Sequence, residues 1–591
     1  MEVEVQAIER STSGQSQNVN AAAPLAGVSL AGGFYMLVLL AAAIMRFTAL
    51  GRIPLAPTEA AEALAAWRFL QPGSLPMDPG SPAYFSLTSL LMSLFGVSDG
   101  VARFVPALFG LGLVALPWLL HRQLGRLSVL IAAALLAASP LNSVVSRTAG
   151  GDAIALFAVL LFAISLFKLH LESEDTRWIF ALAVSLGLGL CSSPLFYSGL
   201  LALLLAWFIT RSIAGEPYWG AWPPGAAFRN AVIAGLLLFI GLSTRFFTYP
   251  AGLGDAAQLF GTWLGQFGFA GGVSGTLAPF LLLGRYEAIL VLLGGVAFVW
   301  AYWRSTTARI WLTFWLLTTF VVMLLQSTTP VNVLLATLPA YLLIGHFSGY
   351  LVGKHAGRWT WLLTAGLLLV GAILLVNTTR YLRISVYEQD LSNLWLMAIA
   401  LGAAALMLYY FWSMTDAAPG AAIWSAVLLL LLAYQWGTAW HLTHFAANDP
   451  RESWVIEGTD DDIPVMLEML TDIAREVTNS DNELQLLSAV DTPVFAWYLR
   501  DFPLATLGQA VPPQATQQVI ISSAASAEPQ FGADYVGTDF GLLRAGATMP
   551  LESTAPVSDL LRWWLFHETS SNMIEERVIL WVRADLVQPE S

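Results

Sequence analysis

Thirteen long runs of apolar residues follow one another along the first three quarters of the chain, separated by short polar stretches. Each run is close to the ~20 residues that an α-helix needs to cross a bilayer. We therefore predict a mainly α, polytopic membrane protein with about 13 transmembrane helices. The predicted spans are Ala31–Ala49, Val101–Leu120, Leu127–Val145, Asp152–Leu169, Trp178–Cys191, Leu195–Thr210, Asn230–Phe247, Tyr286–Tyr302, Ile310–Leu325, Val331–Leu351, Trp359–Val376, Leu394–Trp412 and Ala421–Ala439.

The first long polar interruption runs from Arg52 to Gly100. Pro57, followed by Thr58 and Glu59, predicts a helix start with Thr58 as the N-cap. The helix is too short to span, so it should lie along the interface and hold its acids near the membrane surface. Ionisable residues at that depth are candidates for a functional site. The alternative is an ordinary amphipathic linker with solvated acids.

Composition supports the membrane class. The 591 residues are 57% hydrophobic and only 11% charged, with a mean hydropathy of +0.66, whereas soluble proteins carry roughly 25% charged residues. The single cysteine, Cys191, excludes an intramolecular disulfide and a cysteine-based zinc site. Residues 1–28 are polar and resemble no secretory signal peptide, so we predict a disordered cytoplasmic N-terminus there.

The distribution of lysine and arginine predicts the orientation in the membrane. With the N-terminus in the cytoplasm, short inside loops hold about ten of these residues and outside loops about six. An odd number of spans then places the 51–100 loop and everything after His441 on the extracytoplasmic side. The predicted domains are the N-terminus 1–28, a transmembrane domain 29–440 and a soluble extracytoplasmic domain 441–591.

The predicted soluble domain is strongly acidic. From Asp449 onward it holds 23 acidic and 7 basic residues, a net charge near −16 against −13 for the whole chain. This balance argues against nucleic acid and against docking on anionic lipid. Alternating helix and strand patterns predict one small α/β domain. The strands are expected at Glu483–Val490, Gln518–Ser523 and Val578–Val582, and the helices from Ile463, over Pro493–Phe502 and over Ser558–Glu568.

Other chemistry is sparse in this sequence. The glycine pairs lack the strand–turn–helix context of a phosphate loop, and the seven histidines show no metal-ligand spacing. We therefore expect no cofactor and no metal. What remains are charged residues near the extracytoplasmic ends of spans, where arginine suits phosphate because its guanidinium forms paired hydrogen bonds. Snorkelling and interface anchoring are the alternative role for such arginines.

Four stretches carry a family resemblance. They are DPGSPAYF from Asp78, SDGVARFVPALFG from Ser98, RFFTYPAGLGDA from Arg245 with the later WLGQF and RYE, and AWYLRDF from Ala496. The order and spacing of these four stretches resemble those of the GT-C membrane glycosyltransferases. The resemblance extends from about residue 31 to 590. The nearest broad branch is that of protein O-mannosyltransferases and aminoarabinose transferases. Within it the chain is most similar to the flippase-activity-associated membrane proteins of archaeal-type glycosylation in prokaryotes.

The resemblance implies a transferase of the plasma (inner) membrane that takes a sugar from a polyprenyl-phosphate donor. In such enzymes an acidic pair in the first loop supplies the general base, which activates an acceptor hydroxyl while polyprenyl phosphate leaves. Here the expected Asp-Glu pair reads Thr58-Glu59, so Glu59 becomes the candidate base, with Asp78 and Asp152 in support. The implied ligands of the donor phosphate, expected to converge on one pocket, are Arg147, Arg245 and Arg285.

Two departures from the family pattern keep other functions open. Thr58 replaces the aspartate, and GGVSGTLAPF stands where an aromatic, proline-centred stretch is expected. A threonine cannot accept a proton near neutral pH. The second hypothesis is therefore a non-catalytic scaffold or subunit that keeps the lipid cavity and works with other membrane proteins. A transporter or flippase is the third, but it lacks evident inverted repeats and broken helices. The expected partners are the lipid-linked sugar donor and membrane lipids.

Overall fold

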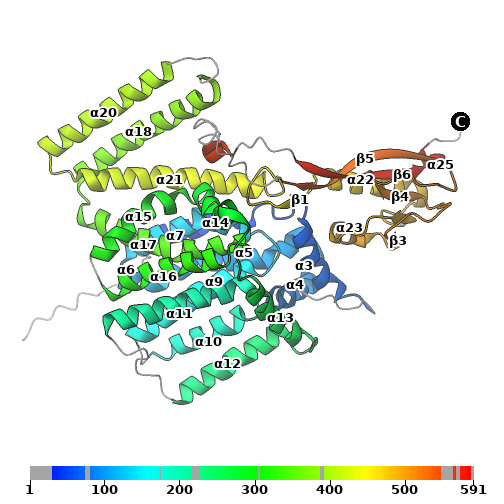
Figure 1. The fold of residues 1–591 in the computed structure, drawn as a ribbon, viewed down its shortest axis with the longest axis horizontal. Helices are drawn as coiled ribbons and strands as arrows, with labels where there is room; N and C mark the ends of the chain where they lie inside the picture. The colour runs from blue at the N-terminus through cyan, green and yellow to red at the C-terminus, as the bar shows by residue number, and fades with distance from the viewer. Residues whose placement is uncertain are drawn as a thin grey trace, which may run out of the picture.

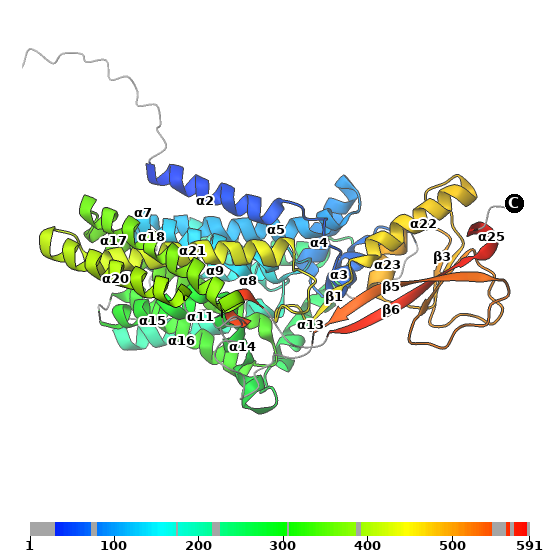
Figure 2. The ribbon, with the colours of Figure 1, turned by 90° about the horizontal axis from the view of Figure 1, so that it is seen from above.

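The computed structural model describes residues 30–72, 80–172, 175–215, 225–303, 306–385, 392–546, 563–567 and 573–587. These residues form a bundle of roughly aligned helices, with a sheet domain beyond one end of it (Figures 1 and 2). The predicted N-terminal segment 1–28 lies outside the described residues.

In these ranges, nine helices are long and apolar enough to cross a membrane, or up to ten if a bent pair counts as one span. The chain is thus a multi-pass membrane protein. The nine are α5 (Asp99–Ala115) continued by η1 (Leu116–Leu120) and α6 (His121–Leu124), α9 (Asp152–Leu171), α11 (Pro194–Ala214), α12 (Gly225–Ser243), α16 (Thr307–Leu325), η2 (Pro330–Val333) with α17 (Leu334–Lys354), α18 (Arg358–Arg380) with the π-helical turn η3 (Tyr381–Ser385), α20 (Ser392–Met414) and α21 (Pro419–His444).

Each of the 13 predicted spans overlaps helical residues over most of its length, but the count of 13 is not confirmed. Three predicted spans fall on shorter apolar helices, and a fourth belongs to the pair that bends by 98°. The short ones are α2 (Leu30–Phe47), α7 (Arg126–Ala138) and α10 (Arg177–Gly189), and the bent pair is α14 (Gly272–Tyr286) and α15 (Ala288–Trp303). Among all these helices α17 is the most buried, at the centre of the bundle, and α20 the least.

The end of the bundle that faces the sheet domain is built from short helices. They are α3 (Pro57–Arg68), α4 (Pro82–Phe95), α8 (Pro140–Val145) and α13 (Gly252–Gly265). Proline at the first helical position starts α3, α4 and α8, because its fixed φ suits a helix and its missing N–H costs nothing there. Half of α3 is buried, Glu59 included. The predicted N-cap is wrong, because Ala56 and not Thr58 holds that position. That the helix lies along the membrane interface stays a prediction.

The sheet domain has six strands in the order β1-β5-β6-β4-β2-β3. β2 pairs in parallel with β3 and β4, and the other pairs are antiparallel. The strands are β1 (Glu457–Thr459), β2 (Leu486–Ser488), β3 (Ala505–Leu507), β4 (Val519–Ser523), β5 (Tyr535–Ala545) and β6 (Ile574–Arg583). The helices are α22 (Asp462–Thr478), α23 (Pro493–Tyr498) with η4 (Leu499–Asp501), and α25 (Ala584–Val587). Most of the helix predicted over Ser558–Glu568 lies outside the described residues.

Hydrogen bonds tie the sheet domain to the first loop. Thr459 Oγ1 donates to the carbonyl oxygen of Leu55 at 2.6 Å, and Tyr498 Oη accepts from the backbone N–H of Leu55 at 2.7 Å. The indole N–H of Trp497 and the hydroxyl of Tyr498 both donate to the carboxylate of Asp99, at 2.8 and 2.7 Å. The two polar regions therefore lie at the same end of the bundle. Which side of the membrane that end faces stays a prediction.

Candidate active site

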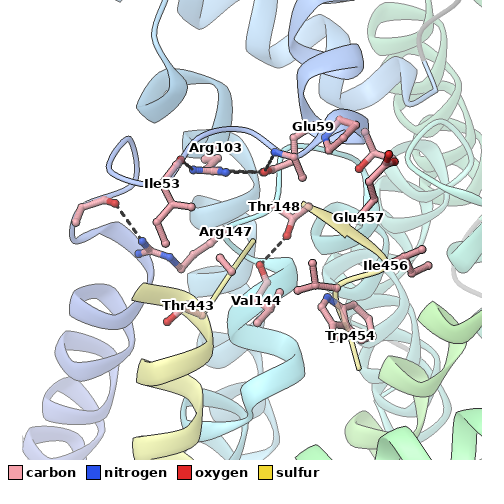
Figure 3. A pocket seen from close by; sticks show the side chains of 16 residues that line it. Ile53, Glu59, Arg103, Val144, Arg147, Thr148, Thr443, Trp454, Ile456 and Glu457 are labelled. Carbon is pink, nitrogen blue, oxygen red and sulfur yellow. Dashed lines mark hydrogen bonds and ion pairs between the residues drawn. The ribbon is translucent and has the colours of Figure 1, made fainter. Parts of the chain in front are cut away.

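A pocket of about 280 Å³ opens where the first loop, the bundle and the sheet domain meet (Figure 3). Its charged and aromatic lining residues come from segments far apart in sequence. They are Glu59 on α3, Arg103 on α5, Arg147 after α8, and Trp454 and Glu457 before and at the start of β1. The rest of the wall is mostly apolar and includes Ile53, Val144, Val455 and Ile456. Such a surface suits a ligand with an anionic head and an apolar chain.

Glu59 borders this pocket, but its carboxylate is already engaged. Arg103 donates to it twice, from Nε to Oε1 at 2.9 Å and from Nη2 to Oε2 at 2.5 Å. The backbone N–H of Ala149 donates to Oε1 at 2.7 Å, and that of Ala56 to Oε2 at 3.0 Å. A carboxylate accepts about four hydrogen bonds, so these four donors fill its hydrogen-bonding capacity. Glu59 therefore serves as an anchor that joins three segments.

A second cavity of about 270 Å³ adjoins the first, and the two share Thr58, Thr148 and Trp454 as walls. Thr58 thus stands at the partition, where the expected aspartate would have faced both cavities. The lining of the second cavity is polar and small. It consists of Thr58, Glu62, Gly80, Ser81, Val145, Thr148, Ala149, Gly150, Gly151, Asp152, Ser192, Ser193 and Trp454.

Two acids face this second cavity. Asp152, the first residue of α9, accepts a hydrogen bond from Ser193 Oγ at 2.5 Å. Burial, and then the charge of Asp152, raise the pKa of the Glu62 carboxyl to about 7, although the backbone N–H groups of Gly80 and Ser81 act in the opposite direction. Glu62 Oε2 is buried and has no hydrogen-bond partner among the described residues. Asp78, the third predicted acid, lies outside the described residues.

Arg147 is the predicted phosphate ligand that lines the first pocket. Its Nη1 donates to the carbonyl oxygens of Met45, Arg46 and Thr48, and its Nη2 to that of Ala49, at distances from 2.7 to 3.3 Å. These contacts fix the guanidinium against the C-terminus of α2. Burial, and then the neighbouring charge of Arg103, lower the pKa of Arg147 to about 10, so it stays cationic at neutral pH.

The three arginines predicted to bind the donor phosphate do not line one pocket in the structure. Arg245 follows α12, donates from Nε to Ser89 Oγ at 2.7 Å and stacks on Phe69. Arg285 is buried against the linker to the sheet domain, where Nη1 donates to Ser453 Oγ at 2.6 Å and Nη2 lies 3.7 Å from Glu452. Neither lines either cavity. The chain bends by 98° between α14 and α15, immediately after Arg285 and Tyr286, and this bend was not predicted from the sequence.

The residues of this site that were not selected from sequence include Arg103, Glu62, Trp454 and Glu457. Arg103 lies inside an apolar run, and the only signal was the rarity of a charge there. Glu62 was visible as a loop acid, and its signal was its spacing of four residues from Thr58, which places both on one helix face. In the part of the chain that the structure covers, no group of three or more His, Cys, Asp or Glu residues is placed to hold a metal ion.

The comparisons with known proteins agree with this architecture. The family model of dolichyl-phosphate-mannose-protein mannosyltransferases matches residues 78–222. The structure of ArnT from Cupriavidus metallidurans bound to undecaprenyl phosphate superposes with a TM-score of 0.54 at 14% identity, over 94% of this chain and 99% of that one. The chain has the fold of the GT-C glycosyltransferases. The narrower likeness to flippase-activity-associated proteins stays a prediction.

Two further solved structures match over a smaller share of this chain. The apo form of the same ArnT gives a TM-score of 0.50 at 15% identity, with 80% of this chain and 85% of that chain covered. An oligosaccharyltransferase from Archaeoglobus fulgidus tethered with an acceptor peptide gives 0.45 at 12% identity, with 83% and 69% covered. No curated protein matches the chain. At these identities the likeness to the two ArnT structures establishes the fold alone, and the activity has to be argued from the site.

Proposed function

We propose that this protein is a membrane glycosyltransferase that moves a sugar from a polyprenyl-phosphate donor to an acceptor hydroxyl on the extracytoplasmic face of the plasma membrane. The observation that carries the proposal is the pair of adjoining cavities. One offers Arg147 within apolar walls, and the other offers two carboxyl groups in a polar setting. A lipid phosphate needs the first environment, and a hydroxyl that must lose a proton needs the second.

The wall residues that the two cavities share indicate how the donor would be oriented. With the donor phosphate at Arg147 and the isoprenoid chain against Val144 and Ile456, the sugar would reach past Thr58 toward the second cavity. The acceptor oxygen attacks the anomeric carbon there, the bond from that carbon to the phosphate oxygen breaks, and polyprenyl phosphate leaves with the electron pair. Undecaprenyl phosphate bound to ArnT supports a ligand of this class. The contacts of Arg245 and Arg285 give no support to the role predicted for them.

The test is a transfer assay on the purified full chain in lipid nanodiscs with a radiolabelled polyprenyl-phosphate sugar. We expect release of polyprenyl phosphate and saturable donor binding. Arg147→Gln should weaken donor binding by about 10- to 100-fold, because a charge-assisted contact to phosphate is worth roughly 1.5–3 kcal/mol. Arg177→Gln is the matched control, since that side chain is 90% exposed at the start of α10. Equal binding by both variants would remove Arg147 from the donor site.

A non-catalytic scaffold is the alternative function, and one observation favours it. Thr58 holds the position expected for the base, and Glu59 beside it is fully engaged. A scaffold would bind the donor lipid through Arg147 without turning it over. Saturable donor binding with no release of polyprenyl phosphate, across a panel of sugars and hydroxyl acceptors, would favour the scaffold over the transferase.

A further inference from the structure

Glu62 is half-buried, and it differs from the fully buried glutamates among the described residues. Glu59 has Arg103, Glu452 has Arg285 and His567, and Glu287 accepts from Ser139, Tyr341, Gln435 and the backbone of Leu141. Glu62 pairs with no described cation, and its buried Oε2 has no partner among the described residues. A glutamate that only stabilises the fold would have its oxygens satisfied in this way.

The described residues that line the second cavity with Glu62 are polar or small, and none of them is positively charged. Asp152 from α9 and Tyr84 from α4 interact with it electrostatically. Its other oxygen, Oε1, lies so close to Gly80 that a Cβ at that position would overlap it. The carboxyl group is thus seated by backbone on one side and borders the second cavity on the other.

Position 62 also has the right relation to the missing aspartate. Thr58 and Glu62 are four residues apart on α3 and line the same cavity. One helical turn is about 5.4 Å, and glutamate is one methylene longer than aspartate. A carboxyl group lost at residue 58 is therefore replaced one turn further along, facing the same space.

We propose that Glu62 is the general base of the transfer reaction and that the second cavity holds the acceptor hydroxyl. The inference rests on the proposed function and names the group that completes it. In the step, the acceptor O–H gives its proton to the Glu62 carboxylate as its oxygen bonds to the anomeric carbon. The carbon–oxygen bond to the phosphate breaks, and polyprenyl phosphate takes the electron pair. Glu62 then returns the proton to solvent.

Glu59 and Asp152 are less suited to this role. Both oxygens of Glu59 are held by Arg103 and two backbone N–H groups, so its acceptor positions are occupied and an incoming hydroxyl would have to displace one of these donors. Asp152 accepts from Ser193 and acts on Glu62 through its charge. We therefore assign Asp152 as a positioning residue.

The experiment compares Glu62→Gln with wild type in the transfer assay, alongside donor binding. General-base catalysis typically contributes 10²- to 10⁴-fold, so we expect at least a 100-fold loss in kcat with donor binding unchanged. Glu468→Gln, which removes an exposed acid on α22, is the matched control and should keep full activity. In the Glu62→Gln background, Thr58→Asp should restore part of the rate, because it returns a carboxylate to the same cavity.

The outcomes separate this inference from the proposed function. If wild type transfers sugar and Glu62→Gln is equally active, Glu62 is not the base although the enzyme assignment stands. If wild type binds the donor and never transfers the sugar, the proposed function is wrong, and the role of Glu62 as its general base is wrong with it. Should Glu62→Gln misfold, Glu62→Asp replaces it. We expect that variant to stay folded and to shift the pH–rate profile of kcat, and an unshifted profile would overturn the proposal.

Discussion

Glu59 and Glu62 lie on the same short helix, and their different roles come from residues that are distant in sequence. Arg103 and the backbone of Ala149 surround Glu59 with donors, whereas Asp152 brings a second negative charge to Glu62. The sequence shows two acids three residues apart and no more. Their environments depend on how α5, α9 and α3 pack, so the better candidate for the base could not be chosen before the fold was known.

Glu59→Gln should therefore act on stability. Removing one partner of a buried ion pair leaves an uncompensated charge and costs about 3–5 kcal/mol, so Arg103 without its carboxylate should lower the thermal midpoint of the purified protein clearly. The measurement is thermal unfolding in nanodiscs, with Glu468→Gln as the exposed control. A variant as stable as wild type that loses all transfer would restore Glu59 as a candidate for the base.

Glu62 predicts a pH dependence of both stability and rate. Its pKa rises from 4.5 to about 7 in the folded protein, so between these values the folded state holds a proton that the unfolded chain has released. Stability should then fall as pH rises through this window, by on the order of 3 kcal/mol. The rate should rise across pH 7, because the base must be ionised. Asp152 and Tyr84 are the titratable groups that face it.

The check is to record thermal midpoints and transfer rates from pH 5 to 8 for wild type and Glu62→Gln. In Glu62→Gln, the part of the fall in stability that is due to residue 62 should be absent. The residual transfer rate of this variant should no longer rise near pH 7. Matching pH profiles for the two proteins would show that Glu62 does not titrate in this range.

At the scale of elements, the positions of helices are predicted well from the sequence. The positions at which helices are interrupted or bent are predicted poorly. Apolar runs of suitable length mark helical segments regardless of neighbours, and all 13 predicted spans overlap helical residues over most of their length. The break between α7 and α8 at Ser139 was missed, because one predicted span ran across it. α14 was not predicted, so the 98° bend between α14 and α15 was missed as well, although the charged residues Arg285 and Glu287 stand there. β5 was missed because glycines and an aspartate interrupt its pattern, while its pairing with β6 supplies the stability.

The contact between α5 and α23 predicts how the sheet domain is held. Asp99 accepts from Trp497 and Tyr498, and hydrogen bonds to a charged group contribute about 1.5–3 kcal/mol each. Asp99→Ala should loosen this contact and raise hydrogen exchange in α23 and around Leu55. Asp539→Ala, which removes an exposed ion pair with Arg577 in the sheet, is the control. Unchanged protection in Asp99→Ala would mean that other contacts hold the domain.

At the scale of the whole molecule, the fold brings the first loop, the cavities and the sheet domain to one end of the bundle (Figure 2). The excess of lysine and arginine in the loops of the opposite end predicts that end to be cytoplasmic. An acidic domain of net charge near −16 also favours the side away from the anionic cytoplasmic leaflet. The cavities should therefore open to the extracytoplasmic side, where the proposed reaction would take place.

Cysteine labelling in intact cells tests this orientation. The native Cys191 is buried, so a Ser526→Cys substitution in the exposed turn after β4 gives one accessible thiol, and Ala356→Cys between α17 and α18 gives another. A membrane-impermeant maleimide should label residue 526 in intact cells and residue 356 only after permeabilisation. The reverse pattern would place the sheet domain and both cavities in the cytoplasm. A transferase would then have to draw donor and acceptor from that side, which contradicts the proposed site of reaction.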